Sequence, residues 1–363
     1  MKINSISLRN FRNYEKEVIN LSPQSNILIG PNAAGKTNIL ESVYVMSFSK
    51  SYKAKDEDLI KHRQDFFKVT ASLDDKEIVL IASKDGKRAE VNKVKIKKLT
   101  DFIGNLRVVL FSPDDILMFK NGPQERRNFL DYSLLQLSKS YVSNYQSFKK
   151  QLKLRNEYLK YLLPKVDVKG KIEDEMLDIL TENFVESNKL INKEREDFTK
   201  KLEEVVRRKY QDISGSKDIV KIGYETNFKN EIDFYKDKYN QDLILGTTNH
   251  GCHRDDLKFY KNKDLFEKVA SQGELRMLSI AIKLALCELI KDEKSDPPIL
   301  LLDDVFSELD TNHQNKLLSS LDRDTQIIIT TTDLNEINKN TIASSKVFSV
   351  LDGHIKEISN GRW

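Results

Sequence analysis

The residues from Gly30 to Thr37 read G-P-N-A-A-G-K-T, which is the spacing of a phosphate-binding loop. Glycines let the backbone wrap its N–H groups around a polyphosphate, the lysine reaches the outer phosphates, and the threonine hydroxyl can ligate Mg²⁺. An apolar segment precedes the loop and a helical pattern follows it, as such a site requires. A glycine turn that merely starts a helix is the alternative. We predict that the phosphates are bound by Gly30, Pro31, Asn32, Ala33, Ala34, Gly35, Lys36 and Thr37.

A pair of carboxylates far along the chain suits the second half of the same site. The apolar run 299–302 is typical of a buried central strand and is followed by Asp303 and Asp304. A carboxylate in the first position can hold Mg²⁺ together with Thr37, and we assign this role to Asp303. The second position suits a group that polarises the attacking water, so Asp304 and Lys36 are predicted to be catalytic. An N-cap pair after a core strand is the alternative.

A third motif, Ser271 to Glu274, reads S-Q-G-E and lies shortly before that strand. It opens a run of apolar residues at helical spacing, namely Leu275, Leu278, Ile282 and Leu286. At a helix N-terminus, Ser271 and Gly273 offer a hydroxyl, free N–H groups and the positive end of the helix dipole to a phosphate. A second phosphate site requires a second nucleotide or a second subunit. An ordinary helix start is the alternative.

The remaining pattern indicates how these motifs are positioned. Short strands are predicted before the loop, an antiparallel meander over 66–96, further strands at 299–302 and 326–330, and a hairpin over 347–358. Helical periodicity dominates from residue 123 to about 210. We therefore predict an α/β fold, a P-loop ATPase lobe with an antiparallel β subdomain, interrupted by an inserted all-helical lobe. The predicted boundaries are 1–122, 123–245 and 246–363.

The composition of the 363 residues limits the class of protein. With 60 basic and 56 acidic side chains, the net charge of +4 does not by itself indicate nucleic-acid binding. The two cysteines, Cys252 and Cys287, are too few for a disulfide framework and favour the reducing cytoplasm. We find neither a signal peptide nor an apolar run long enough to span a membrane, so no membrane association is expected.

A local basic segment is the candidate for DNA binding. Residues 139–165 carry many lysines and a single acid, Glu157. Such a patch can displace counterions from DNA phosphates, although a solvated helix face is the alternative. Aromatic residues are not interleaved with the charges, which favours backbone contact with duplex DNA over stacking on single strands. The predicted DNA-contacting residues are Lys149, Lys150, Lys153, Arg155 and Lys53.

The order of these motifs resembles the ABC ATPases of the SMC type. The resemblance implies that ATP and Mg²⁺ are the ligands, and that Ser271 and Gly273 face the γ-phosphate held by a second copy, so that ATP joins a homodimer. It also implies that residues 307–310, which read S-E-L-D, cross the dimer interface. Thr331 stands where many members place a switch histidine, and it is a third catalytic candidate.

Three further stretches are similar to the RecF family. They are Leu8 to Tyr14; Phe111 to Asp115, with Gly122-Pro123 and Arg126 to Asp131 after it; and Gly251 to Asp256. Too few residues separate Lys36 from Ser271 for the long coiled coils of other SMC-type proteins. The resemblance implies an ATP-dependent homodimer that binds duplex DNA and single-strand/duplex junctions. It also implies a role in loading the RecA recombinase at single-strand gaps with RecR and RecO, in recombinational repair, replication restart and the SOS response.

The sequence departs from the family pattern at four positions. Cys252 replaces a proline, Pro31 an acidic residue, and Asp304 and Thr331 the glutamate and histidine of faster relatives. A shorter carboxylate reaches the water less well, so we expect a slow, DNA-stimulated ATPase that acts as a switch.

Parts of the sequence are also compatible with two other functions and one other kind of site. An SMC-related ATPase serving a nuclease would need a metal cluster, for which Asp255-Asp256 is the spare acidic pair. A transport ATPase subunit would normally carry Leu-Ser-Gly-Gly-Gln instead of the sequence around Ser271. A zinc site at His250, Cys252 and His253 lacks a second pair of ligands.

Overall fold

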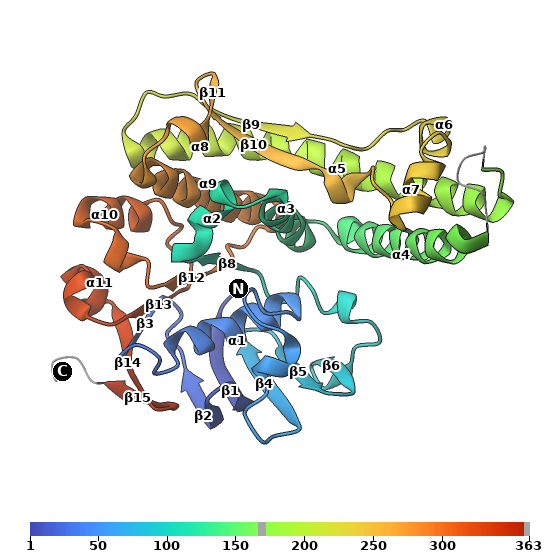
Figure 1. Cartoon of the computed structure of the whole chain (residues 1–363). Helices are drawn as coiled ribbons and strands as arrows, with labels where there is room; N and C mark the ends of the chain where they lie inside the picture. Colours follow the sequence, from blue (N-terminus) through green and yellow to red (C-terminus); the bar gives the residue numbers. More distant parts are fainter. Residues whose placement is uncertain (166–171, 359–363) are drawn as a thin grey trace. The chain divides into compact units, whose positions relative to one another are not determined.

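The computed structural model describes residues 1–165 and 172–358, which form two compact units (Figure 1). The first unit contains Met1–Ile116, Arg208–Lys217 and Gln272–Trp363. The second contains Leu117–Arg207 and Asp218–Ser271. The chain therefore leaves the first unit and returns to it, as an inserted lobe requires.

An antiparallel sheet forms one layer of the first unit. Within the described residues it has six strands in the order β2-β1-β4-β5-β6-β7. Side chains along β4 alternate between buried and half-buried, so one face of the sheet contributes to the core. The strands are β1 (Ile3–Phe11), β2 (Tyr14–Asn20), β4 (Phe66–Leu73), β5 (Glu77–Ser83), β6 (Gly86–Val91) and β7 (Val94–Lys95).

A mostly parallel sheet forms the other layer. In the described part of the chain its six strands run in the order β15-β14-β3-β13-β12-β8, and only β14 and β15 pair antiparallel. The continuous apolar run in β12 is fully buried, as expected for a central strand. The strands are β3 (Ser25–Ile29), β8 (Val108–Phe111), β12 (Ile299–Asp303), β13 (Ile327–Thr331), β14 (Ser345–Leu351) and β15 (His354–Ile358).

Helix α1 contacts strands of both sheets. The parallel register brings the carboxyl ends of β3, β12 and β13 to one edge of their sheet, where open α/β sheets bind ligands. The longer helices of this unit are α1 (Lys36–Phe48), α9 (Gln272–Lys294), α10 (Thr311–Ser319) and α11 (Lys339–Ala343). Its short 3-10 turns are η1 (Asp56–Leu59), η2 (Leu99–Asp101), η3 (Pro113–Ile116), η6 (Phe306–Glu308) and η7 (Leu334–Glu336).

The second unit is mainly helical. Pro123 at the first turn starts α3, and the Ser138 hydroxyl caps α4 by accepting from the Tyr141 N–H. The helices are α2 (Leu117–Lys120), α3 (Pro123–Leu137), α4 (Lys139–Leu162), α5 (Glu175–Ser214, which ends in the first unit), α6 (Ile232–Lys236), α7 (Tyr239–Leu245) and α8 (Phe266–Val269). The short turns are η4 (Leu163–Lys165) and η5 (Cys252–Arg254).

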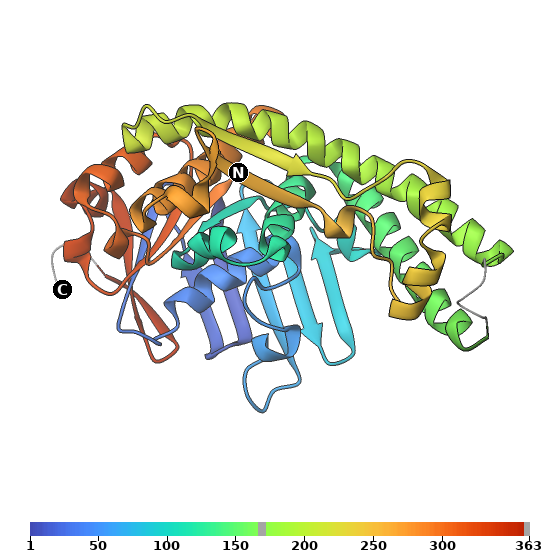
Figure 2. The ribbon, with the colours of Figure 1, turned by 45° about the horizontal axis from the view of Figure 1, so that its top comes forward.

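The predicted all-helical lobe needs a correction, because the second unit also holds a sheet in the order β11-β10-β9. Its strands are β9 (Val220–Glu225), β10 (Asp256–Lys261) and β11 (Asp264–Leu265). Strands β9 and β10 run alongside α5 (Figure 2), where the Ile222 N–H donates to Glu203 Oε2 at 2.7 Å.

The same sheet shifts the boundaries of the predicted lobes. Pairing with β9 places β10 in the second unit, so residues 246–271 do not join the ATPase lobe as predicted. The helical lobe likewise begins at Leu117, before the predicted residue 123. Two short strands separated by several helices leave no local signal of their pairing, which is why periodicity missed it.

Candidate nucleotide-binding site

The phosphate-binding loop joins β3 to α1 and needs its glycines. Gly35 precedes α1 with φ of 112°, and a Cβ there would lie 2.5 Å from Asn13 Nδ2. A Cβ on Gly30 would lie 2.1 Å from the Val350 carbonyl oxygen. The turn is held from outside because Asn13 Nδ2 donates to the Ala34 carbonyl at 3.1 Å and the Tyr14 hydroxyl donates to the Gly35 carbonyl at 2.9 Å. The predicted loop is therefore a rigid backbone cradle.

Lys36 points back into this cradle. Its Nζ donates to the carbonyl oxygens of Gly30 at 2.7 Å and of Pro31 at 2.9 Å. Burial lowers the pKa of the Lys36 amine, and the charges of Asp304 and Asp303 oppose that shift. The amine is thus a poorly solvated donor at the centre of the loop, where phosphate oxygens could replace the two carbonyls.

The two predicted magnesium ligands lie in direct contact, although they are far apart in the sequence. Thr37 Oγ1 donates to Asp303 Oδ1 at 2.9 Å, and Thr330 Oγ1 donates to the same oxygen at 2.9 Å. Asp303 is only 9% exposed at the end of β12. A hydroxyl of the phosphate loop beside a carboxylate at a strand end is the pair that holds Mg²⁺ in P-loop ATPases. These residues therefore fit the ion.

Asp304 is held in a strained position beside that pair. Its φ of 54° lies in the left-handed region, and its N–H donates to Thr330 Oγ1 at 3.0 Å. Its Oδ1 is buried and has no hydrogen-bond partner among residues 1–165 and 172–358. Burial, followed by the charge of Glu336, raises the pKa of the Asp304 carboxyl, while Lys36 lowers it. A buried acceptor with a free lone pair suits a group that orients a water molecule.

Thr331 follows at the end of β13, and its side chain turns toward Glu336. The buried hydroxyl donates either to the Asp333 carbonyl at 2.8 Å or to Glu336 Oε2 at 2.9 Å. Thr331 therefore contacts the carboxylate whose charge acts on Asp304. The sequence indicated a role for Thr331 but gave no reason to select Glu336.

A second residue that the sequence did not indicate is Tyr52. Its hydroxyl donates to Asp303 Oδ2 at 3.4 Å, and burial, followed by the Asp303 charge, raises the pKa of the phenol. In the stretch after α1 the sequence predicted a role only for Lys53, and the aromatic residue beside it was the available signal.

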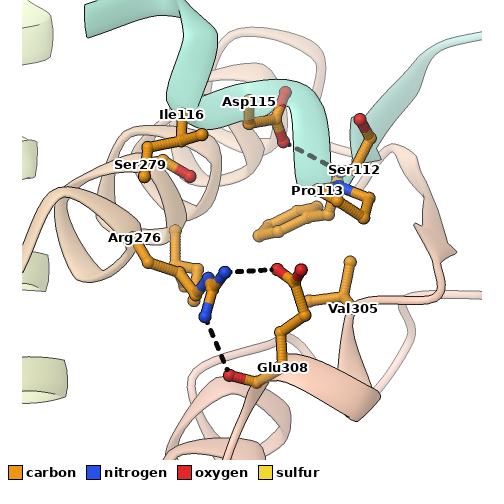
Figure 3. Close-up of a pocket in the computed structure, with 10 residues that line it drawn as sticks. Ser112, Pro113, Asp115, Ile116, Arg276, Ser279, Val305 and Glu308 are labelled. Carbon is orange, nitrogen blue, oxygen red and sulfur yellow. Dashed lines mark hydrogen bonds and ion pairs between the residues drawn. The ribbon is translucent and has the colours of Figure 1, made fainter. Parts of the chain in front are cut away.

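The S-Q-G-E motif opens α9, and Ser271, Gln272 and Gly273 are all exposed. One turn later Arg276 forms an ion pair with Glu308 of the S-E-L-D segment, with 2.7 Å between Nη2 and Oε2 (Figure 3). Arg276 Nη1 also donates to the Glu308 carbonyl at 3.2 Å. In the same segment the Ser307 hydroxyl donates to the Asp304 carbonyl at 2.7 Å. A continuous set of contacts thus joins the start of α9 to the catalytic candidate.

The predicted DNA-contacting residues divide into two groups. Lys149, Lys150, Lys153 and Lys53 are exposed. Arg155 is 0% exposed, which corrects its assignment to DNA. Its Nη1 donates to Asp242 Oδ2 at 2.8 Å and to Thr248 Oγ1 at 2.6 Å, and its Nε donates to Thr181 Oγ1 at 3.0 Å. Arg155 lies one helical turn from the buried Leu159, so it faces the core of the second unit.

Two of the motif blocks in the second unit bind to each other. Arg126 forms a two-pronged ion pair with Asp256, at 2.7 and 3.0 Å. Arg195 donates to Asp131 Oδ1 at 2.7 Å and lies 3.4 Å from Asp255 Oδ2. The acidic pair considered for a nuclease is therefore paired with arginines.

The side chains considered for zinc have protein partners as well. His250 Nδ1 lies 3.0 Å from Asn227 Oδ1, and Cys252 Sγ donates to the Asn188 carbonyl at 3.4 Å. His253 Nε2 donates to the Thr248 carbonyl at 2.8 Å. Among the residues that the structure describes, no group of three or more His, Cys, Asp or Glu side chains could hold a metal ion.

No described helix has the length and apolar character needed to cross a membrane.

Comparison with known proteins supports the expected fold and family. The family model of the RecF/RecN/SMC N-terminal domain matches residues 2–356. The DNA replication and repair protein RecF of Staphylococcus carnosus is 35% identical over 372 residues, covering 98% of this chain and 100% of that protein. The protein of the same name from Agathobacter rectalis is 39% identical over 368 residues, covering 99% of each chain.

Solved structures give the same result. The recombination mediator protein RecF with ATP, of the RecFOR pathway, has a TM-score of 0.87 and 28% sequence identity, covering 99% of this chain and 98% of that one. An Smc head bound to the C-winged helix domain of ScpA has a TM-score of 0.53 at 17% identity, which shows a shared fold. The predicted class of ATPase head is confirmed.

Proposed function

The chain belongs to the RecF family of DNA replication and repair proteins, and from this premise we propose that it is a slow ATPase that pairs two copies around ATP on DNA. The observation that carries the proposal is the contact between Thr37 and Asp303, with the unpartnered oxygen of Asp304 beside it. A solved RecF structure that is 28% identical over nearly the whole chain is a complex with ATP, which supports ATP as the nucleotide.

The proposed roles follow from where each side chain lies. Backbone N–H groups of residues 30–37 would bind the phosphates, and Lys36 would exchange its carbonyl partners for phosphate oxygens. Mg²⁺ would be held by Thr37 and Asp303 and would neutralise charge on the phosphates. Asp304 would orient the attacking water. Because an aspartate is one methylene shorter than a glutamate, this contact would be longer, which supports slow turnover.

Pairing of two copies is proposed for the exposed start of α9. Ser271 and Gly273 would face the nucleotide of the second copy, and hydrolysis would release that contact. The Arg276–Glu308 ion pair would couple the start of α9 to the loop that follows Asp304.

We further propose that the closed pair binds duplex DNA and single-strand/duplex junctions, and that DNA stimulates hydrolysis. Family membership supports a part in loading the RecA recombinase at single-strand gaps with RecR and RecO, and in replication restart and the SOS response. The free thiols Cys252 and Cys287 support the reducing cytoplasm as its location.

The experiment is a DNA-binding titration with and without ATP, combined with size measurement. Duplex, single strand and a junction would be compared, and tighter binding with ATP is expected. Ser271→Arg should leave ATP binding intact and prevent pairing. Lys200→Ala, an exposed change on α5, is the control and should pair normally. A protein that remains a monomer in every nucleotide state would refute the pairing.

A further inference from the structure

Three basic side chains of the second unit act electrostatically on His253. Arg127 belongs to α3, Lys149 to α4 and Arg254 to η5. The pKa of His253 is lowered to about 4, mainly by burial, and the charges of Arg254, Lys149 and Arg127 contribute to the lowering. Cations from three separate segments are therefore gathered at one place.

The backbone holds two of these segments against each other. Arg127 Nη1 donates to the Asp255 carbonyl at 2.7 Å, which places its guanidinium beside the residue that follows Arg254. The charge of Arg254 contributes, after burial and the charge of Arg195, to a lowered pKa of Arg127. The hydrogen bond from Arg127 to the Asp255 carbonyl therefore holds the two arginines close enough for their charges to repel each other.

An aromatic contact brings in the third segment. The ring centroids of Phe148 and His253 are 6.3 Å apart, so Lys149, the next residue of α4, lies beside η5. Lys149 and Arg254 are exposed and Arg127 is half-exposed. We call Arg127, Lys149 and Arg254 the basic triad.

The neighbouring acids are already engaged beneath the surface. Asp255 lies beside Arg195 and accepts hydrogen bonds from the Tyr224 hydroxyl and the Asn227 N–H. Asp256 is paired with Arg126 and with Lys258. The Arg254 N–H donates to the Gly251 carbonyl at 2.8 Å, but its guanidinium forms no hydrogen bond or ion pair with another described residue. Positive charge therefore remains in excess at the surface of the triad.

We propose that the basic triad binds consecutive phosphates of the DNA backbone. Gathered cations repel one another, and a polyanion relieves that repulsion. The guanidinium fork fits a phosphate with two parallel hydrogen bonds, which an ammonium group cannot do. Exposed side chains from three segments suit a chain of phosphates rather than one enclosed ion. The inference rests on the proposed DNA binding and names the surface responsible.

The test measures how DNA affinity depends on salt. Each phosphate contact contributes about 0.9 to the slope of log affinity against log salt concentration for duplex DNA. The double variant Arg254→Ala/Lys149→Ala should therefore lower the slope by about two and weaken binding. Lys189→Ala, an exposed lysine of α5 outside the triad, is the matched control and should leave the slope unchanged. Unfolding temperature and ATP binding, measured on the same samples, should match those of the unchanged protein.

The outcomes separate this inference from the proposed function. If the unchanged protein with ATP binds no DNA, the proposed function fails. If it binds DNA and the double variant keeps the original slope, the triad is not the phosphate site and the inference is overturned. An equal fall of the slope in the Lys189→Ala control would also overturn it, because the effect would then reflect overall charge.

Discussion

The two units both bury charged side chains, but they partner them in different ways. In the second unit Arg126 and Arg195 are bound by carboxylates of the same unit. In the first unit Asp304 has a buried oxygen that forms no hydrogen bond with any described residue. Buried charges that are fully paired hold a structure together, whereas one that lacks a partner is costly and is retained when a ligand or a reaction uses it. Among carboxylates, pairing therefore separates structural charges such as Asp131 and Asp256 from Asp304. The distinction does not extend to arginines, because Arg155 Nη2 in the second unit also lacks a hydrogen-bond partner among the described residues.

The largest effect is expected where the charge lacks a partner. Asp304→Asn should reduce ATP turnover by about 100-fold or more, because an amide cannot act as a general base. ATP binding should persist, since Lys36 and the loop are unchanged. The unfolding temperature should stay the same or rise, because burial and Glu336 disfavour the carboxylate. Steady-state hydrolysis and thermal unfolding would be measured together. A marked loss of stability would place Asp304 with the structural charges.

The converse result is expected for Arg195. Arg195→Ala leaves Asp131 and Asp255 buried without their main cation, which should cost about 3–5 kcal/mol of unfolding free energy. Lys200→Ala, at an exposed position on the same helix, should leave the stability close to that of the unchanged protein. Denaturant unfolding measures both variants. If Arg195→Ala were as stable as its control, the ion pairs of Arg195 with Asp131 and Asp255 would not stabilise the packing of α3, α5 and η5.

A pH effect on stability is expected from His253 in the second unit. His253 is partly buried and has a pKa of about 4, below the usual 6.5. Between these two values the unfolded chain binds more protons than the folded one, so stability rises with pH across that window and is lost as the pH falls from 6.5 to 4. The shift corresponds to roughly 3 kcal/mol at full effect.

The test replaces the imidazole with a neutral donor. His253→Gln should flatten the dependence of unfolding free energy on pH between 4 and 6.5, while preserving a donor for the Thr248 carbonyl. The exposed His62 in the first unit is the comparison site, and the dependence on pH should persist after His62→Gln. Equal profiles for the protein and both variants would contradict the assigned burial effect.

How far the sequence could predict this molecule depended on the range of each interaction. The loop from Gly30 to Thr37 and the two aspartates after β12 are local patterns that carry their own chemistry. Their contact, through Thr37 and Asp303, was predictable because parallel strands end at a common sheet edge. Tyr52 and Glu336 approach the site from turns, and nothing local shows where a turn will point.

The sequence predicted neither the burial of Arg155 nor the sheet formed by β9, β10 and β11. A lysine-rich helix suggested that every basic residue in it faces solvent, yet Arg155 shares the buried side with Leu159. The four-residue spacing from Arg155 to Leu159 was visible in the sequence and indicated a shared face, but the positive charge of arginine favoured the prediction of an exposed side chain. The pairing of β9 with β10 depends on the fold of the helices between them, so no window of the sequence contains it.

The smallest effect concerns the contact between α9 and the S-E-L-D segment in the first unit. Arg276 and Glu308 are each partly exposed, and water screens such pairs, so Arg276→Ala should cost only about 0.2–1 kcal/mol of unfolding free energy. Its effect on ATP-dependent pairing should exceed its effect on stability, because the ion pair fixes the start of α9 relative to the loop after Asp304. Lys283→Ala, which removes the ion pair with Asp115 farther along α9, is the comparison. If both variants dimerise normally at the same ATP concentration, the Arg276–Glu308 ion pair is structural only. The first unit would then resemble the second, with Asp304 as the exception.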